Sequence, residues 1–247
     1  MRAAWRDSGK VYGYRKLQDD LADMGESCCP NRVARLSRLA GIRAQIGYKR
    51  RPGHCGGKPS LAVDNTLDRR FDVEAPDKAR VTDITYIRTH EGFAYLAVVL
   101  DLFSRRIVGW SMQARQTTNV VLQALLAAVW RRKPKGRVLV HSDQGSLLGL
   151  DPRITSMEWA SFLEHHELEP SMSRRGNCHD NAVAESFFNL LKRELIRRKV
   201  CRTRDEARAD VFDYIEMFCN PTRKHARNGM LSPVEFERQH KPQAEGV

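Results

Sequence analysis

The middle of the chain alternates between short apolar runs and polar turns, and this pattern predicts a sheet. Three runs rich in β-branched and aromatic residues predict antiparallel strands over 81–88, 93–104 and 105–113. Helical and strand-like periods then alternate along the chain. They predict helices over 117–132, 155–167, 180–196 and 202–218, and strands over 137–143 and 168–173. Three antiparallel strands followed by such an alternation indicate an α/β fold, with a mixed five-stranded sheet flanked by helices.

The chain before this region has a helical period, which predicts two short helices over 13–24 and 31–42. Asn31 is a candidate N-cap for the second helix. Three arginines share one flank of that helix: Arg32, Arg35 and Arg38. Such a pair of helices suits a helix-turn-helix that contacts DNA, and a helical hairpin with solvated arginines is the ordinary alternative.

These patterns divide the chain into four parts: a helical DNA-binding module (1–46), a basic linker (47–75), an α/β core with C-terminal helices (76–240) and a short tail (241–247). The linker prediction rests on GYKRRPGHCGGKPS, which holds four glycines and two prolines and has no apolar period. The order of elements in the core is that of a ribonuclease H-like fold.

The charge of the chain favours a nucleic acid as partner. Lysine and arginine number 42 against 30 acidic residues, a formal net charge of +12, and such an excess neutralises phosphates. A soluble protein that is merely basic is the alternative. No apolar run approaches the roughly 20 residues of a membrane span, and the first residues have no secretion signal. We therefore expect a cytoplasmic protein without a membrane partner and with reduced thiols. Its six cysteines match no known zinc spacing.

Three carboxylates stand where an acidic residue needs a compensating partner. Asp83 lies within a predicted inner strand, where an ionised carboxylate is costly without a cation or hydrogen bonds. Asp143 directly follows another predicted inner strand, at the end where the metal and ligand sites of α/β sheets gather. Glu185 lies in the first turns of the helix predicted over 180–196, and Lys192 returns to nearly the same side of that helix.

Each of these carboxylates taken singly has a structural explanation. Asp83 is then a polar strand residue, Asp143 a turn former, and Glu185 a negative charge at a helix N-terminus. Taken together, two aspartates on adjacent strands and a glutamate on a helix beside them form a hard oxygen cage for Mg²⁺ or Mn²⁺. Lys192 is then placed to hold a phosphate beside the cage.

Several motifs resemble one known family: TDITYI, YLAVVLDLFSRRIVGW, HSDQGS, SMSRRGNCHDNAVAESFFNLLKRE and NPTRKHARNGMLSPVEFE. They are similar to the DDE transposases of bacterial insertion sequences, of the OrfB type made from the second of two overlapping reading frames, whose core is related to retroviral integrase. The resemblance covers nearly the whole chain, from Tyr12 to about Glu237. By position it implies that Asp83, Asp143 and Glu185 are the catalytic, metal-binding residues, the same three that the residue pattern selects.

The resemblance implies an integrase-like catalytic core in the 76–240 part, with two Mg²⁺ or Mn²⁺ ions. Water cuts DNA at the element end, and the freed 3′ hydroxyl attacks another phosphodiester in line. The implied partners are terminal inverted repeats and target DNA on the nucleoid, a homo-oligomer on paired ends, and an upstream-frame product, separate or fused. Arg174 and Arg175, within SMSRRGN, are predicted DNA contacts together with Lys192 and the arginines of the helical module.

The chain departs from the family's pattern in one connection and at single positions. Eight residues, 147–154, stand where the pattern has two. The six extra residues, which we assign to 147–152, lie between Asp143 and the next predicted helix. Arg80 stands where relatives usually have Trp, and Cys55 and Cys219 stand where Tyr is usual. A few added loop residues change the closure entropy little, so the fold should tolerate them.

These departures leave two alternatives to an active transposase. One is a decayed copy that binds DNA without cutting it. The other is a ribonuclease H-like nuclease that hydrolyses DNA without joining strands. Metal-dependent nicking of a duplex that carries an element end excludes the first alternative, and a strand-transfer product excludes the second.

Overall fold

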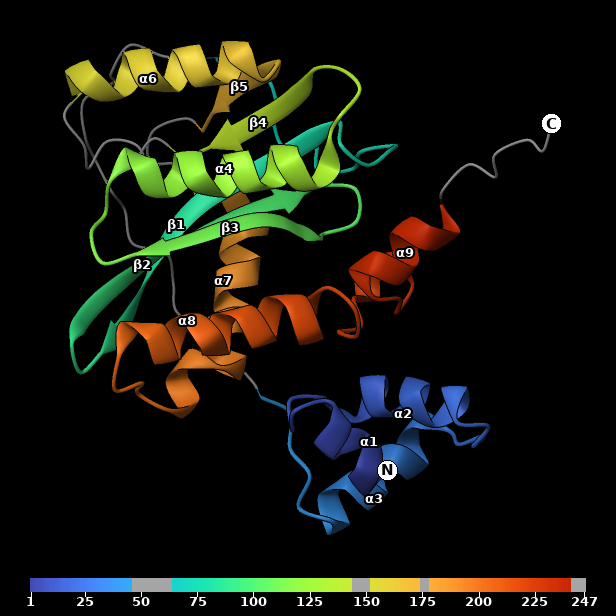
Figure 1. Ribbon diagram of the computed structural model, residues 1–247. Helices are drawn as coiled ribbons and strands as arrows, with labels where there is room; N and C mark the ends of the chain where they lie inside the picture. The colour runs from blue at the N-terminus through green and yellow to red at the C-terminus, as the bar shows by residue number, and fades with distance from the viewer. Residues whose placement is uncertain (46–63, 144–151, 174–177, 241–247) are drawn as a thin grey trace.

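A five-stranded mixed sheet forms the centre of the protein (Figure 1). The computed structural model describes residues 1–45, 64–143, 152–173 and 178–240, and it describes only the backbone of 152–158 and 178–179. The strands are β1 (Ala79–Thr89), β2 (Gly92–Asp101), β3 (Ile107–Gln113), β4 (Val138–Ser142) and β5 (Leu168–Met172). Their order is β3-β2-β1-β4-β5, with β2 antiparallel to β1 and β3, and β4 parallel to β1 and β5. The predicted sheet is confirmed, and β1 is a central strand.

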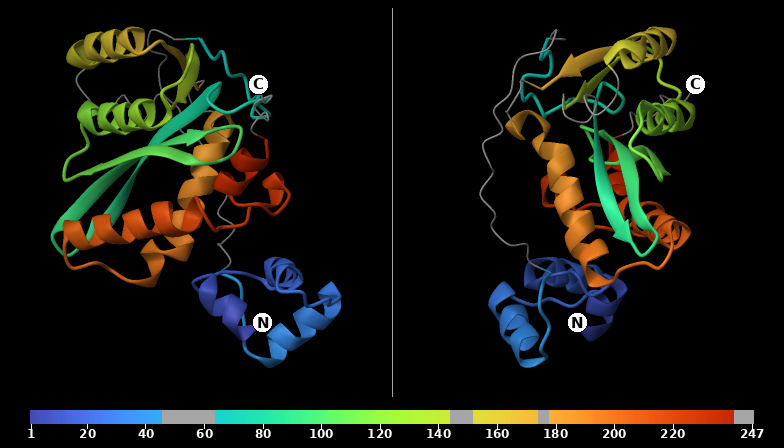
Figure 2. Two further views of the ribbon diagram at one scale, coloured as in Figure 1. Left: turned by 45° about the vertical axis from the view of Figure 1, so that its right-hand side comes forward. Right: turned by 90° about the vertical axis from the view of Figure 1, so that its left-hand side faces the viewer.

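Helices cover both faces of the sheet (Figure 2). On one face, α4 (Thr118–Arg132) and α6 (Pro152–His165) pack over a buried cluster that includes Val99 of β2 and Val140 of β4. On the other face, α7 (Ala182–Glu194) and α8 (Arg204–Phe212) pack over a second cluster. The sheet is therefore the middle layer of three, as expected for parallel strands that are buried on both faces.

One glycine sets how closely α4 lies on the sheet. A Cβ atom added to Gly109 of β3 would lie 2.2 Å from the carbonyl oxygen of Ala124 and 2.7 Å from the backbone nitrogen of Ala128. Both alanines lie on the buried side of α4. The absence of a side chain at residue 109 thus brings the helix backbone into direct contact with the strand.

The N-terminal helices form a separate small core. The elements are α1 (Arg2–Asp7), α2 (Tyr14–Asp23) and α3 (Pro30–Leu39). Their buried cluster includes Leu17, Leu21 and Val33. The expected N-cap at Asn31 was wrong, because α3 begins at Pro30 with Cys29 as its N-cap. Proline suits the first helical position, where its missing N–H would have had no helical partner.

The helical module contacts the C-terminal part of the chain through Lys224. The Nζ atom of Lys224 forms ion pairs with three carboxylates of α2: Asp19, Asp20 at 3.2 Å and Asp23 at 2.6 Å. The backbone N–H of Lys224 donates to the hydroxyl oxygen of Tyr12 at 2.8 Å. Burial lowers the pKa of Lys224, but the three carboxylates outweigh this effect and hold the pKa above its ordinary value.

Short elements complete the C-terminal part. They are η1 (Cys178–Asn181), η2 (Ile196–Arg198), η3 (Asp213–Cys219), η4 (Ala226–Asn228) and α9 (Pro233–Gln239). The π-helical η3 continues α8 directly, so the helix predicted over 202–218 is present with a change of winding. Among the helices that the structure describes, none is long and apolar enough to cross a membrane.

Arg80 is fully buried and takes part in a chain of ion pairs. Its Nη2 atom donates to Asp77 at 2.7 Å. Arg132 of α4 bridges Asp77 and Glu237 of α9, each at 2.8 Å, and Glu237 also accepts from Arg106 at 2.8 Å. This chain joins the start of β1, the end of α4 and α9.

The last part of the predicted linker (47–75) packs on the core. Leu67 is 3% exposed and belongs to the cluster under α7 and α8, and its backbone N–H donates to Oγ of Ser171 at 3.1 Å. Arg69 donates to the buried carboxylate of Asp180 at 2.8 Å. The glycine- and proline-rich composition of GYKRRPGHCGGKPS therefore does not extend to residues 64–75, where the apolar side chains of Leu67, Phe71 and Val73 pack with the core.

The helix after the extra residues begins earlier than predicted. It starts at Pro152, although the pattern placed its start at Thr155. The backbone of 152–154 is thus helical, which fits the preference of proline for the first turn of a helix. The rest of the extra segment, Leu147–Asp151, lies outside the described residues.

Candidate active site

Asp83 lies at the middle of β1 on the face that α7 covers. Val81 and Ile87, which alternate to the same face, are buried in the cluster that contains residues of α7. The Asp83 side chain is partly buried, and one of its carboxylate oxygens accepts a hydrogen bond from the backbone N–H of Ile84 at 2.7 Å. The strand therefore directs a carboxylate into a mostly apolar layer.

Asp143 is brought beside Asp83 by the register of two parallel strands. The last described pair of β1 and β4 is Thr82 with Ser142. Asp83 directly follows Thr82, and Asp143 directly follows Ser142. Asp143 is partly buried and follows the carboxyl end of β4. Because the two strands run in the same direction, this register places the two aspartates next to each other.

Glu185 approaches the two aspartates from α7. It lies in the first turn of the helix, and its side chain is exposed. Phe187, Phe188 and Leu191 are buried on the side of α7 that faces the sheet, which fixes the helix across β1. Residues far apart in sequence thus bring three carboxylates to one place, as the pattern predicted.

The charges of the other two carboxylates act on Asp83. The pKa of Asp83 is raised to about 7, mainly by burial; the charges of Asp143 and Glu185 act in the same direction and the hydrogen bond from Ile84 acts against them. The charge of Lys192 also lowers this pKa. Three carboxylates gathered in this way form a donor set that a hard divalent cation fits, because the charge of the cation offsets their negative charges.

Lys192 lies on the same side of α7 as predicted, and the structure adds an aromatic neighbour. Its Nζ atom lies 5.4 Å from the centroid of the Tyr86 ring. Burial and the charge of Arg197 lower the pKa of Lys192, and the charge of Asp83 opposes this shift. The sequence pattern did not single out Tyr86, because an aromatic residue on a strand is ordinary without knowledge of its exposure.

Polar contacts hold the strand end and the helix start around the carboxylates. The buried ring of His141 on β4 contacts Oγ of Ser171 and Oγ of Ser173, each at 2.9 Å, which ties the end of β4 to β5. Asp180, just before α7, accepts hydrogen bonds from Asn65 and Arg69 at 2.9 and 2.8 Å. These contacts restrict the movement of the backbone before Asp143 and before Glu185.

The opposite end of α7 is anchored by a buried glutamate. Arg223 donates to both carboxylate oxygens of Glu194, at 2.9 and 2.6 Å, and the hydroxyl of Tyr214 donates to the same carboxylate at 2.8 Å. Glu194 and Arg223 are 6% and 5% exposed. The helix that carries Glu185 is therefore held by ionic and hydrogen-bonded contacts at its C-terminal end.

The three predicted DNA contacts of the helical module are not part of the carboxylate group. Arg32, Arg35 and Arg38 are exposed on α3, which lies in the helical module beyond the C-terminal end of α7 (Figure 2). Arg174 and Arg175 lie outside the described residues. The structure therefore brings together four of the predicted residues and places three others on a separate surface.

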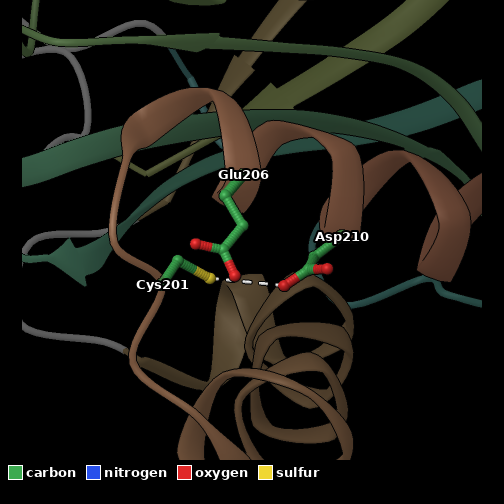
Figure 3. A group of neighbouring side chains, drawn as sticks. All are labelled: Cys201, Glu206 and Asp210. Atoms are coloured by element: carbon green, nitrogen blue, oxygen red, sulfur yellow. Dashed lines mark hydrogen bonds between the residues drawn. The ribbon is translucent and has the colours of Figure 1, made fainter.

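A second acidic group stands before and within α8, and its contacts are structural (Figure 3). The thiol of Cys201 donates to Asp210 at 3.3 Å, and Nζ of Lys199 pairs with Asp210 at 2.7 Å and with Glu206 at 3.4 Å. Burial raises the pKa of Cys201 to about 11, and the hydrogen bond to Asp210 acts in the same direction. The raised pKa keeps the thiol in its protonated form, and one lysine already pairs with both carboxylates.

Comparison with known families assigns both parts of the chain. The model described as "Integrase core domain" matches residues 73–178, and a second model of the same description matches residues 185–240. The model described as "HTH-like domain" matches residues 1–51. The observed sheet and the N-terminal helices lie within these matches.

Relatives and a solved structure agree with this assignment. The transposase InsF for insertion sequence IS3A of Escherichia coli is 40% identical over 95% of this chain and 80% of its own length. The transposase for IS904 of Lactococcus lactis is 38% identical over 96% of this chain and 92% of its own length. A chain of the simian T-cell lymphotropic virus intasome, solved with a PP2A regulatory subunit, shares the fold at a TM-score of 0.54 and 13% identity, over 95% of this chain and 77% of that chain. The protein therefore belongs to the OrfB-type DDE transposases of bacterial insertion sequences.

Proposed function

We propose that Asp83, Asp143 and Glu185 together bind divalent cations, and that the protein uses this site to cut and join DNA at the ends of its insertion sequence. The observation that supports the proposal most strongly is the register of β1 and β4, in which Asp83 and Asp143 lie next to each other, below the helix that carries Glu185. A carboxylate group of this kind needs a cation to hold it in its charged form.

The ions are Mg²⁺ or Mn²⁺, and we propose two of them, since DNA cleavage in line needs charge stabilisation at both the attacking and the leaving oxygen. When bound, the ions supply the Lewis acidity that activates the nucleophile and stabilises the leaving oxygen. Asp83 and Asp143 hold this site from the sheet, and Glu185 closes it from α7. Lys192 holds a phosphate of the same strand beside the carboxylates.

DNA is held over a larger surface than this site. The net charge of +12 supports many phosphate contacts. We propose that Arg32, Arg35 and Arg38 on α3 contact the terminal repeats, and that Arg174 and Arg175 contact DNA near the cut. The protein then acts as a homo-oligomer on paired ends in the bacterial cytoplasm, on the nucleoid, with an upstream-frame product as a further partner. We propose two functional units, the helical module (1–46) and the core. The start of the core moves from residue 76 to about Asp64, because residues such as Leu67 and Arg69 contact it.

The test of this proposal is the exchange of each carboxylate for its amide. Asp83→Asn, Asp143→Asn and Glu185→Gln should each reduce Mg²⁺-dependent cleavage of a duplex bearing an element end by about a thousandfold or more, because several kcal/mol of charge stabilisation are lost. Cleavage is measured on denaturing gels, and DNA retention and far-ultraviolet circular dichroism should stay as in the unaltered protein.

Glu169→Gln is the matched control, since Glu169 is an exposed carboxylate on β5. It should cut like the unaltered protein. If one of the three carboxylate variants cuts DNA normally, the residue it alters is not part of the site. Strand-transfer products from the unaltered protein separate joining from hydrolysis alone.

A further inference from the structure

An exposed aromatic pair lies next to Lys192, on the face of the sheet opposite to that of Asp83. Tyr86 of β1 is 59% exposed and Phe93 of β2 is 47% exposed. Their ring centroids lie 5.3 Å apart in an edge-to-face arrangement. Burial of such rings is favourable, so large exposed rings side by side mark a surface that contacts another molecule more often than a single exposed ring does.

The position of Tyr86 follows from the alternation along β1. Thr85 and Ile87 are buried, whereas Tyr86 and Arg88 point to the opposite face and are exposed. Tyr86 is three residues beyond Asp83, which at the rise of a strand is a distance of about 10 Å. That distance is about three nucleotide steps along one DNA strand.

Lys192 connects this aromatic surface with the carboxylates. Its Nζ atom lies 5.4 Å from the Tyr86 ring, within the range of a cation–π contact. The same ammonium group acts on the charge of Asp83. A cation next to an aromatic ring is the combination that binds a phosphate and the base attached to it.

We infer that Tyr86, supported by Phe93, is a stacking surface for an unpaired base of the element end, within about three nucleotides of the cut. The base is unpaired because bases inside a duplex are stacked on each other, so a protein ring can cover only one that has left the stack. Lys192 holds the phosphate of that nucleotide. The inference rests on the proposed function, which locates the cut at the carboxylates.

The experiment uses the full chain and duplexes that represent a cut element end, with 2-aminopurine in turn at each of the first four positions on either side of the cut. Stacking on a ring quenches the fluorescence of 2-aminopurine. In the complex with the unaltered protein we expect this quenching at one or two neighbouring positions, relative to an unpaired 2-aminopurine that stacks on no ring. Tyr86→Ala should remove it and weaken binding of an end with unpaired terminal bases by roughly 5- to 150-fold.

Two variants separate stacking from other effects. Tyr86→Phe retains the ring and should retain the quenching. Trp130→Ala removes a still more exposed ring on α4, 72% exposed, and should change nothing. Equal quenching in the unaltered protein and in Tyr86→Ala would overturn the inference, and so would loss of quenching in Tyr86→Phe or its absence at every position. The fluorescence requires no cleavage, so its result is distinct from that of the carboxylate variants.

Discussion

Arg80 shows how a single departure from the family's pattern can be accommodated. A buried arginine without a partner would be strongly destabilising. Here its Nη2 atom pairs with Asp77, although its Nε and Nη1 atoms are buried without a hydrogen bond. The chain of ion pairs through Arg132 and Glu237 distributes these charges between β1, α4 and α9. The substitution is thus part of a connected set of residues, not an isolated change.

A second residue, His225, gives the stability of the protein a defined pH dependence. Burial, with the charges of Arg223, Lys16 and Arg105, lowers the pKa of His225 to about 3. In the unfolded chain histidine takes up a proton below about pH 6.5. Between these pH values the unfolded state binds more protons, so the free energy of unfolding falls as the pH falls. The contribution of His225 should be at most about 1.4 kcal/mol per pH unit.

Urea denaturation at pH 7.5, 6 and 5 measures this effect against His225→Gln, whose side chain does not titrate. The difference in unfolding free energy between the two proteins should shrink as the pH falls. His240→Gln is the control, because His240 is exposed, and it should run parallel to the unaltered protein. A constant difference between unaltered protein and His225→Gln at all three pH values would contradict the prediction.

At the scale of single residues, the sequence predicted that three carboxylates lie together, but it did not single out Tyr86 next to Lys192. Asp83, Asp143 and Glu185 stand out because ionised groups in inner strands or at their ends need a partner, and the motifs that resemble the family select the same residues. Tyr86 has no such signal. Its exposure depends on how far α4 extends over the sheet, and its contact with Lys192 depends on where α7 crosses β1, neither of which is encoded locally.

Among the elements, the contact between α4 and β3 depends most on one position. In Gly109→Ala the new Cβ atom meets the backbone of α4, which must move away from the sheet. Overpacking of this kind costs about 1–3 kcal/mol. We therefore expect the melting temperature to fall by several degrees in differential scanning calorimetry.

A second substitution tests the cause. Ala128→Gly removes a side chain that would lie 2.8 Å from the new Cβ atom, but the carbonyl oxygen of Ala124 at 2.2 Å remains. The double variant should therefore recover only part of the lost stability, after correction for the effect of Ala128→Gly alone. A melting temperature for Gly109→Ala equal to that of the unaltered protein would show that α4 moves at no cost.

The elements of the sheet and the short helix α2 were predictable because their periods are regular, whereas α1 and the starts of α3 and α6 were not. β1 to β3 and α4 lie within one to three residues of their predicted bounds. α1 is only six residues long and gives no clear period. α3 and α6 both begin at a proline, at Pro30 and Pro152, where the sequence reading placed a polar cap or a loop. At both places the preference of proline for the first turn of a helix, rather than the apolar period, decided where the helix begins.

Across the whole molecule, the helical module and the core are joined by a charged contact. Lys224→Ala removes an ammonium group from three carboxylates of α2, one of which, Asp20, is half-buried. We expect amide hydrogens of α2 to exchange roughly five- to thirtyfold faster, corresponding to a loss of about 1–2 kcal/mol. The measurement is hydrogen exchange followed by mass spectrometry of the full chain.

Lys199→Ala is the matched control, because Lys199 also pairs with two carboxylates but is an exposed residue of the α/β part of the chain, beside α8. It should leave the exchange of α2 unchanged. Equal exchange of α2 in the unaltered protein and in Lys224→Ala would mean that apolar contacts, such as that of Tyr12 with Phe218, hold the module without the lysine.

The anchor of α7 also has a consequence for the chain while the ribosome is still making it. Glu185 is synthesised before Arg223, whose guanidinium holds the far end of α7 through Glu194. A nascent or prematurely terminated chain thus contains all three carboxylates before the helix that carries one of them is fixed. We expect a chain that ends before Arg223 to leave this helix unanchored, and therefore to lack the alignment on which the proposed cleavage site depends.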